Sequence, residues 1–343
     1  MKKLLNTLYI TSESAYLSLD GENVVVSLEG EDKKRFPLHM LEEIVSFSYK
    51  GASPALMGKC SELEIGLSFF SPNGKYLASV GSCVNGNVVL RHKQSRTADD
   101  ENLSLQISKN IILGKLYNSK YVLLRTLRDH PLQVDSSRIM NSVYQITECM
   151  ERTLSVESKD ELRGIEGVAA AAYFDSFNEM ILQNKAEFVF ETRNRRPPTD
   201  RINALMSLTY TLLSNSYASA LLSAGLDPYI GFMHGERPGR KSLALDMMEE
   251  LRAVYADRFV LYLINNRIIV PEDFEIQENN AVILKEKAKK TFLAEWQNRK
   301  RDEITHPYLK EKIQWGLVPY SQAMLLARYL RDDIDQYPPF FWK

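Results

Sequence analysis

Three acidic residues interrupt an otherwise apolar helical segment close to position 250. Placed on a helical wheel, residues 242–254 are apolar over most of the circumference, which indicates burial. Asp246, Glu249 and Glu250 lie in one adjacent arc, and Ser242 is a good N-terminal capping residue. Carboxylates gathered in a buried helix repel one another, and burial raises that cost. A bound cation is the simplest compensation.

Glu166 and His234 add two further side chains that could share such a cation. In the helical pattern of residues 159–182, Glu166 has apolar neighbours one turn away on either side, so its carboxylate needs a partner. His234 stands twelve residues before Asp246 and fifteen before Glu249. Carboxylate oxygens with one imidazole nitrogen, and no thiolate nearby, favour magnesium or manganese over structural zinc.

Each of these residues also has an ordinary structural interpretation. Glu166 is equally compatible with an arginine partner, and His234 taken alone fits a loop or core histidine. Asp246 and Glu249 could form an exposed stripe on a surface helix. The hypothesis of a metal site therefore depends on the joint occurrence of these residues.

Basic residues accumulate in three segments around these positions. The members are, in order, Arg193, Arg195, Arg196 and Arg201; Arg237, Arg240 and Lys241; and Lys285, Lys287, Lys289, Lys290, Arg299, Lys300 and Arg301. In residues 285–301 the basic residues exceed the acidic ones by five. Positive charge beside an acidic metal site is what an enzyme acting on phosphodiesters requires. For residues 285–301 a solvated helical face is the alternative, and the sequence alone slightly favours it.

The elements that must position these residues fall into two regions. Residues 1–94 contain short β-rich stretches with hairpin-type dipeptides at Asp20-Gly21 and Asn73-Gly74. They predict a small β domain, a sandwich or barrel, with one helix near SPALMGKCSE. The polar stretch 95–102 predicts a linker, and residues 103–343 follow helical periods. The expected fold class is α+β, with a β-sandwich-like domain followed by a larger all-α catalytic domain.

Composition restricts the class of protein further. The 343 residues exceed what one hydrophobic core usually serves, and the 44% hydrophobic content is ordinary for a globular protein. A net charge of −1 means that any nucleic-acid surface is local. Three scattered cysteines form no disulfide or zinc pattern, and we recognise neither a signal peptide nor a membrane span. We therefore expect a cytoplasmic protein.

The longest motif resembles a known family. GLDPYIGFMHGERPGRKSLALDMMEELR (225–252) resembles the metal-binding signature of the CRISPR-associated integrase of spacer acquisition. RGIEGVAAAAYF (163–174) resembles the family's first-glutamate helix, and RNRRPPTDRINALMSLTYTLL (193–213) its arginine–proline–asparagine segment. The opening LLNTLYITSESAYLSLDGENVVV and the ending YPPFFWK look like the branch of subtype I-C systems, so the resemblance covers essentially the whole chain.

The resemblance implies a particular fold and a particular set of site residues. The fold is an N-terminal β-sandwich followed by a helical catalytic domain. A divalent metal, Mg²⁺ or Mn²⁺, is held by Glu166, His234 and Glu249, with Asp246 adjacent and supporting. Many relatives carry an aspartate where Glu249 stands, which leaves the division of roles between Asp246 and Glu249 open. The other residues that match the active-site segment are Asn203, Ser207 and Tyr210.

The resemblance also implies the reaction and the partners. The 3′-hydroxyl of a captured DNA fragment attacks a phosphodiester at the edge of a CRISPR repeat, and nicking of double-stranded DNA is accessible from the same site. Two homodimers of this chain flank one dimer of a small ferredoxin-like adaptation protein in a heterohexamer. Two alternatives remain: a stand-alone structure-selective nuclease of DNA repair, and a non-catalytic DNA-binding scaffold.

Overall fold

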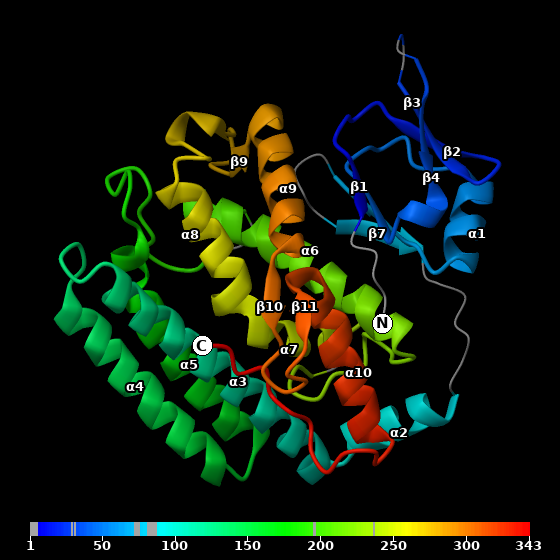
Figure 1. The fold of residues 1–343 in the computed structure, drawn as a ribbon. Helices are drawn as coiled ribbons and strands as arrows, with labels where there is room; N and C mark the ends of the chain where they lie inside the picture. Colours follow the sequence, from blue (N-terminus) through cyan, green and yellow to red (C-terminus); the bar gives the residue numbers. More distant parts are fainter. Residues whose placement is uncertain are drawn as a thin grey trace. The chain divides into compact units, whose positions relative to one another are not determined.

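The N-terminal strands form two sheets, and the rest of the chain is mainly helical (Figure 1). The computed structural model describes residues 6–28, 30, 32–71, 76–80, 88–194, 197–235 and 237–343. The chain divides into two compact units. The first contains the N-terminal strands together with Leu284–Glu303 and Gln314–Leu317, and the second contains the other residues from Val88 onward.

The first unit contains one mixed sheet and one antiparallel sheet. Its strands are β1 (Thr7–Ile10), β2 (Tyr16–Asp20), β3 (Asn23–Ser27), β4 (Lys34–Pro37), β5 (Glu43–Ser46), β6 (Gly66–Phe70) and β7 (Tyr76–Val80). In the mixed sheet β1, β5 and β6 are parallel neighbours, and β7 pairs with β6 in the antiparallel direction. In the other sheet β2, β3 and β4 are antiparallel neighbours. β4 is not among the predicted strands, because its sequence KRFP lacks a β-rich pattern.

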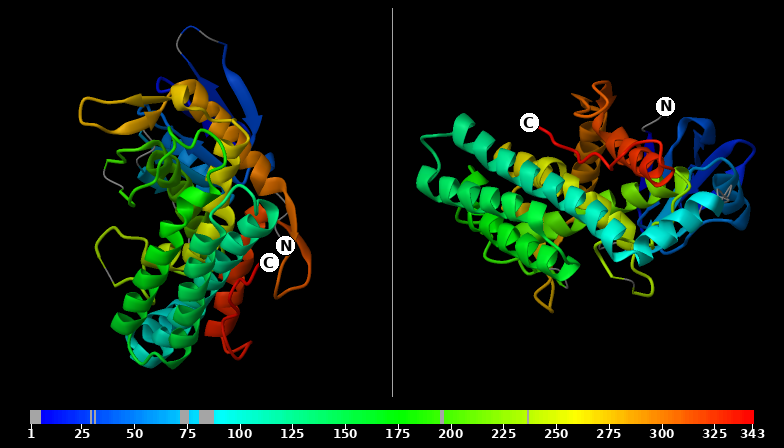
Figure 2. Two further views of the ribbon diagram at one scale, coloured as in Figure 1. Left: turned by 90° about the vertical axis from the view of Figure 1, so that its left-hand side faces the viewer. Right: turned by 90° about the horizontal axis from the view of Figure 1, so that it is seen from below.

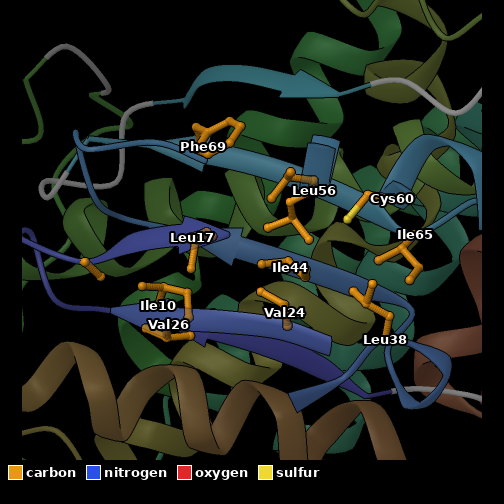
Figure 3. Packing of buried hydrophobic residues seen from close by; sticks show 12 residues of the cluster. Ile10, Leu17, Val24, Val26, Leu38, Ile44, Leu56, Cys60, Ile65 and Phe69 are labelled. Carbon is orange, nitrogen blue, oxygen red and sulfur yellow. The ribbon is translucent and has the colours of Figure 1, made fainter. Parts of the chain in front are cut away.

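One hydrophobic core joins both sheets of the first unit (Figure 3). Leu17 of β2, Val24 of β3 and Ile44 of β5 are fully buried in it, and Leu56 enters it from helix α1 (Pro54–Glu62). The two sheets therefore share a core, as in the expected sandwich. The larger sheet is nevertheless mixed, because α1 provides the crossover that two parallel strands, β5 and β6, require.

Local sequence signals explain where α1 and the first hairpin form. The Ser53 side chain accepts a hydrogen bond from the Leu56 N–H at 3.2 Å, which caps α1 and confirms the predicted helix. Gly21 adopts a φ of +57° in the turn where Asp20 pairs with Asn23, which confirms the hairpin predicted at Asp20-Gly21. The dipeptide Asn73-Gly74 lies outside the described residues.

Helices dominate the second unit (Figures 1 and 2). They are α2 (Val88–Asp99), α3 (Glu101–Asp129), α4 (Ser136–Ser155), α5 (Lys159–Asp175), α6 (Arg201–Ser223), α7 (Ser242–Leu251), α8 (Arg258–Asn265) and α10 (Val318–Leu330). Helices α3, α4 and α5 pack side by side in all views (Figures 1 and 2). None of the described helices has both the length and the apolar character that crossing a bilayer requires.

The predicted linker at residues 95–102 is wrong, because most of this stretch is helical. Helix α2 runs to Asp99, and α3 begins at Glu101. The Asp100 side chain accepts hydrogen bonds from the N–H groups of Asn102 and Leu103, both at 2.9 Å, and so caps α3. A single capping residue, Asp100, thus separates the two helices. The polar composition of residues 95–102 does not distinguish a linker from the end of one helix and the start of the next.

The C-terminal region is neither all-α nor confined to one unit, which revises the domain predicted at 103–343. Two hairpins interrupt the helices: β8 (Phe274–Ile276) with β9 (Val282–Leu284), and β10 (Glu303–Thr305) with β11 (Lys312–Gln314). Helix α9 (Glu286–Arg301) belongs to the first unit, where the Lys300 Nζ donates to Thr7 Oγ1 at 3.0 Å. This contact joins residues 293 positions apart, so the local sequence pattern contains no sign of it.

Helices α7 and α8 are joined by a π-helical turn, η3 (Arg252–Asp257), into one continuous buried segment. The helix begins at Ser242, but Lys241 rather than Ser242 occupies the N-cap position. Asp246 is fully buried and Glu249 is only 8% exposed. The interpretation of these two acids as an exposed stripe on a surface helix is therefore excluded.

Candidate active site

The three carboxylates of α7 have separate partners rather than one shared cation. Asp246 accepts hydrogen bonds from the backbone N–H groups of Phe232, Met233 and His234 at 2.7, 3.0 and 3.0 Å. It also lies 2.5 Å from the imidazole Nδ1 of His234. The chain that precedes α7 is folded around the Asp246 carboxylate, so Asp246 positions His234.

The contact with Asp246 decides the orientation of the His234 imidazole. This hydrogen bond, opposed by burial, raises the pKa of His234. When the Nδ1–H of a histidine donates a hydrogen bond to a carboxylate, Nε2 is left as the nitrogen that can bind a metal. Histidines that bind metals usually have such a carboxylate or carbonyl partner. Gly231 permits the close approach of this segment, because a Cβ there would lie 2.7 Å from Ser242 Cβ and 2.8 Å from Asp246 Oδ2.

One buried lysine, Lys115 of α3, joins Glu166 of α5 to Glu249 of α7. The Lys115 Nζ lies 2.7 Å from Glu249 Oε2 and forms a second ion pair with Glu166 Oε1. The side chains of Lys115 and Glu249 are each 10% exposed, and that of Glu166 is 27% exposed. Two of the three predicted ligands therefore meet at one point, with an ammonium group between them.

Arg252 is a second cation on Glu249. Its Nη1 lies 2.8 Å from Glu249 Oε1 and 2.9 Å from Oε2. Burial alone would raise the pKa of Glu249, but Arg252 and Lys115 outweigh burial and lower that pKa to about 2. His234 acts in the same direction, so it interacts electrostatically with Glu249. Protein cations therefore compensate Glu249 in the described structure, whereas a bound cation was expected as the simplest compensation.

Glu250 belongs to a different network, which holds the C-terminal segment. Its carboxylate accepts hydrogen bonds from the Tyr337 hydroxyl at 2.8 Å, from Gln322 Nε2 at 2.9 Å and from the Phe340 N–H at 3.2 Å. Asn118 of α3 binds the same segment, donating to the Phe340 carbonyl at 2.7 Å. Burial raises the pKa of Glu250 to about 7, although the three donors oppose this. Glu250 is thus a structural anchor, which agrees with its omission from the predicted ligands.

The predicted supporting residues Asn203, Ser207 and Tyr210 gather around Arg193. The Arg193 guanidinium donates to Asn203 Oδ1 at 2.6 Å and to Ser207 Oγ at 3.1 Å. It also lies 5.3 Å from the centre of the Tyr210 ring. Asn203 in turn donates to the Thr192 carbonyl at 2.8 Å, which fixes the loop that carries Arg193. These residues therefore hold one arginine in a defined place.

A cavity of about 470 Å³ lies beside Glu166. Three cationic side chains line it: Lys115, Arg193 and Arg252. Asp257, at the end of η3, lies in the same wall and accepts a hydrogen bond from the Tyr210 hydroxyl at 2.5 Å. Burial raises the pKa of Asp257 to about 6 against the opposing effects of Tyr210 and Arg252. The carboxylates of Glu166, Asp175 and Glu191 line the cavity as well, so its capacity to bind phosphate lies in the guanidinium and ammonium groups alone.

The donor atoms of this site fit a divalent metal by their chemistry. Two carboxylates and an imidazole nitrogen match what Mg²⁺ or Mn²⁺ accepts. Among the described residues, no three His, Cys, Asp or Glu side chains form a ready metal cluster, and the Lys115 ammonium serves as the cation between Glu166 and Glu249. Glu166, His234 and Glu249 remain the ligands that the resemblance implies, and Lys115 marks where a cation contacts Glu166 and Glu249.

The basic residues around α7 and before α6 differ in their roles. Arg237 is exposed, whereas Arg240 donates to the Gly235 carbonyl and Lys241 donates to Asn215 Oδ1 at 3.3 Å. Arg240 and Lys241 thus stabilise the loop itself. Arg195 and Arg196 lie outside the described residues.

Within residues 285–301, some basic side chains are exposed and others are buried. The exposed ones are Lys285, Lys287, Lys290 and Arg301. Lys289 and Lys300 are 8% and 6% exposed, and the Lys289 Nζ lies 5.5 Å from the centre of the Phe47 ring. Arg299 pairs with Asp302 at 2.9 Å. The prediction of DNA binding therefore applies to the exposed residues, because Lys289 and Lys300 are buried within the first unit.

Sequence reasoning missed Lys115, Arg252 and Asp257. Lys115 lies in a helix with several other lysines, and nothing local distinguishes it. Arg252 follows Glu249 by three residues, a spacing that favours an ion pair on one helical face. This spacing in the sequence could have predicted the pair. Asp257 stands in the largely apolar run VYADRFVLYL, where a carboxylate calls for a partner.

Comparison with known sequences gives a family match over most of the chain. Residues 8–298 match the family described as CRISPR associated protein Cas1. The CRISPR-associated endonuclease Cas1 1 of Chlorobaculum tepidum is 46% identical over 343 residues, which is all of both chains. The CRISPR-associated endonuclease Cas1 2 of Rhodospirillum rubrum is also 46% identical, over 347 residues, and both chains are fully covered.

Solved structures show the same fold at lower identity. A casposase bound to its integration product has a TM-score of 0.82 at 23% identity, covering 98% of this chain and 93% of that one. A Cas6-RT-Cas1–Cas2 complex has a TM-score of 0.80 at 22% identity, covering 100% of this chain and 36% of that one. Identities this low support the fold alone, and the family follows from the sequence matches. The chain therefore belongs to the CRISPR-associated Cas1 family.

Proposed function

We propose that this chain is the metal-dependent integrase of CRISPR spacer acquisition, which inserts captured DNA fragments into a repeat array. The observation that carries the proposal is the meeting of Glu166 and Glu249, from two helices, at one cation position. His234, oriented by Asp246, interacts electrostatically with the same carboxylate, Glu249. Full-length relatives named as endonucleases support the reaction class.

In the proposed reaction the 3′-hydroxyl of a captured fragment attacks a phosphodiester at the edge of a CRISPR repeat. One P–O bond forms to the attacking oxygen, and the P–O bond to the 3′-oxygen of the repeat strand breaks. The attacking hydroxyl loses a proton and the leaving oxygen gains one, so the number of phosphodiesters is unchanged. Glu166, His234 and Glu249 would hold Mg²⁺ or Mn²⁺, and the bound ion would supply stabilisation of the negative charge that develops on the phosphate and the leaving oxygen. Arg193 and Arg252 in the cavity wall bind flanking phosphate oxygens.

The proposal extends to partners and subtype. We place two homodimers of the chain on double-stranded DNA with a small ferredoxin-like partner, in a heterohexamer. A structural neighbour described as a Cas6-RT-Cas1–Cas2 complex supports a partner of this kind. The resemblance of the first and last segments supports the subtype I-C branch. The exposed residues Arg237, Lys285 and Lys287 are candidates for contact with the DNA backbone.

Integration of a labelled fragment into a repeat-containing plasmid tests this function, with and without the partner. Strand transfer at the repeat edge should occur with Mg²⁺ or Mn²⁺, stop in chelator and return when metal is restored. Glu166→Gln should lose most of the rate, whereas Glu161→Gln, exposed on the same helix, should keep it. Cutting of branched DNA without integration would instead favour a repair nuclease, and DNA binding without either reaction would favour a scaffold.

A further inference from the structure

Lys115 is the side chain that Glu166 and Glu249 share in the described part of the chain. It reaches them from a third helix, α3, and it is itself only 8% exposed. A buried ammonium is costly unless carboxylates compensate it, and two carboxylates this close need a cation between them. The ammonium and the two acids therefore depend on one another.

A divalent ion at this point would compete directly with the ammonium group. Both cations require the same oxygens of Glu166 and Glu249, and two cations within a few ångströms repel strongly at low dielectric. Lys115 also lines the cavity of about 470 Å³ beside Glu166. That cavity offers room for the lysine side chain once it leaves the carboxylates.

We infer that Lys115 is an exchangeable counter-cation, which holds Glu166 and Glu249 together until a divalent ion binds and then moves into the adjacent cavity. This inference rests on the proposed metal-dependent function. Lys115 is in this view a positioning residue: it sets the metal affinity of the site and the stability of the protein without metal, and it takes no part in the exchange of bonds.

Lys115→Met removes the charge and keeps a side chain of similar length. Thermal unfolding in chelator and calorimetric titration with Mn²⁺ alone measure its effect. The melting temperature in chelator should fall by several degrees, because Glu166 and Glu249 lose their shared cation. The Mn²⁺ affinity should rise about tenfold, because no ammonium competes. Lys120→Met, on the same helix and paired with neither carboxylate, should change neither quantity.

A double variant, Lys115→Met with Glu166→Gln, separates charge from packing. The second change should restore the melting temperature in chelator, because only one carboxylate then remains at the site. This comparison also holds if Lys115→Met alone fails to fold. A loss of stability that persists in the double variant would show a packing role and overturn the inference. An Mn²⁺ affinity of Lys115→Met that is equal to or weaker than that of the wild type would overturn it as well.

Strand transfer by the wild-type protein reports on the proposed function separately. Mn²⁺ binding without strand transfer would contradict the function and leave the exchange intact. The opposite result is also informative. If the wild type carries out strand transfer, but Lys115→Met has the same melting temperature and the same Mn²⁺ affinity as the wild type, the exchange is contradicted and the proposed function is not.

Discussion

Because Arg252 pairs with Glu249, removing the Glu249 carboxylate should destabilise the protein. The neighbouring carboxylates of α7 alone would suggest the opposite. From sequence, like charges close together on a buried helix repel, so removing one relieves strain. In the structure Glu249 is paired with both Lys115 and Arg252. Removing its carboxylate takes the ion-pair partner of the buried Arg252 guanidinium away and leaves only Asp257 and Tyr210 to compensate that charge, which is destabilising.

We therefore expect Glu249→Gln to lower the free energy of unfolding in chelator by about 3 kcal/mol, the scale for breaking a buried ion pair. Strand transfer should also be lost. Denaturant unfolding in chelator and the integration assay measure the two effects. Glu148→Gln, at an exposed position of α4, is the matched control and should alter neither. Stability that is unchanged or higher in Glu249→Gln would show that Arg252 does not depend on Glu249.

Asp257 gives the cavity wall a dependence on pH. Burial raises its pKa from 3.8 in the unfolded chain to about 6 in the folded protein. Between about pH 4 and pH 6 the folded state therefore binds more protons than the unfolded state, and stability falls as the pH rises through this window. Above pH 6 the ionised Asp257 lowers the free energy of unfolding by a constant amount, roughly 3 kcal/mol for a shift of about two pKa units.

Asp257→Asn removes this titration while keeping an acceptor for the Tyr210 hydroxyl. We expect the variant to gain stability relative to the wild type as the pH rises from 4 to 7. Denaturant unfolding at a series of pH values measures the difference. Asp335→Asn, at an exposed position, should follow the wild type throughout. A difference between Asp257→Asn and the wild type that stays flat over this range would argue against the raised pKa.

At the scale of elements, α3 determines how α7 presents its acids. Gly114 lets Glu250 approach, because a Cβ there would lie 3.1 Å from Glu250 Cγ. The next residue, Lys115, binds Glu249, and Asn118 donates to the Glu250 carbonyl at 2.7 Å. Neighbouring turns of one helix thus hold two adjacent carboxylates in different surroundings, one in the site and one in the anchor of the C-terminal segment.

The segment between α6 and α7 depends in the same way on a glycine. A Cβ on Gly231 would overlap with Ser242 and Asp246. Gly231→Ala should therefore displace His234, reduce strand transfer at least tenfold and lower the free energy of unfolding by about 1–3 kcal/mol. In Gly235→Ala the added Cβ would lie 3.9 Å from Arg240 Nη2, an ordinary contact, so this control should remain active. Equal activity of the two variants would rule out the steric argument.

At the scale of the molecule, charge is balanced overall and uneven locally. The net charge is −1, whereas α9 and its N-cap expose Lys285, Lys287 and Lys290. We expect Lys287→Glu to weaken DNA binding and to reduce the slope of log K against log salt by about one, because one phosphate contact is lost. Lys33→Glu, an equal change of charge at another exposed position of the first unit, should leave the slope unchanged. Equal effects of both would indicate net charge rather than a contact on α9.

Much of the organisation follows from the sequence by itself. The β-rich start, the helical periods after it and the burial of α7 are local patterns, and each depends only on residues a few positions apart. The motif resemblance also predicts Glu166, His234 and Glu249 as one set, because these residues stand at the motif positions, although many relatives carry an aspartate where Glu249 stands. The structure brings Glu166 and Glu249 together and couples His234 electrostatically to Glu249.

Only the tertiary structure decided which charges compensate one another. Lys115 pairs with Glu249 across more than a hundred residues of sequence, and α9 joins the N-terminal strands from the far end of the chain. Helical periodicity says which face of an element is buried, but not which other element covers that face. The division of Asp246, Glu249 and Glu250 into a positioning group, a site group and an anchor therefore arises from packing, because each acid meets a different part of the chain.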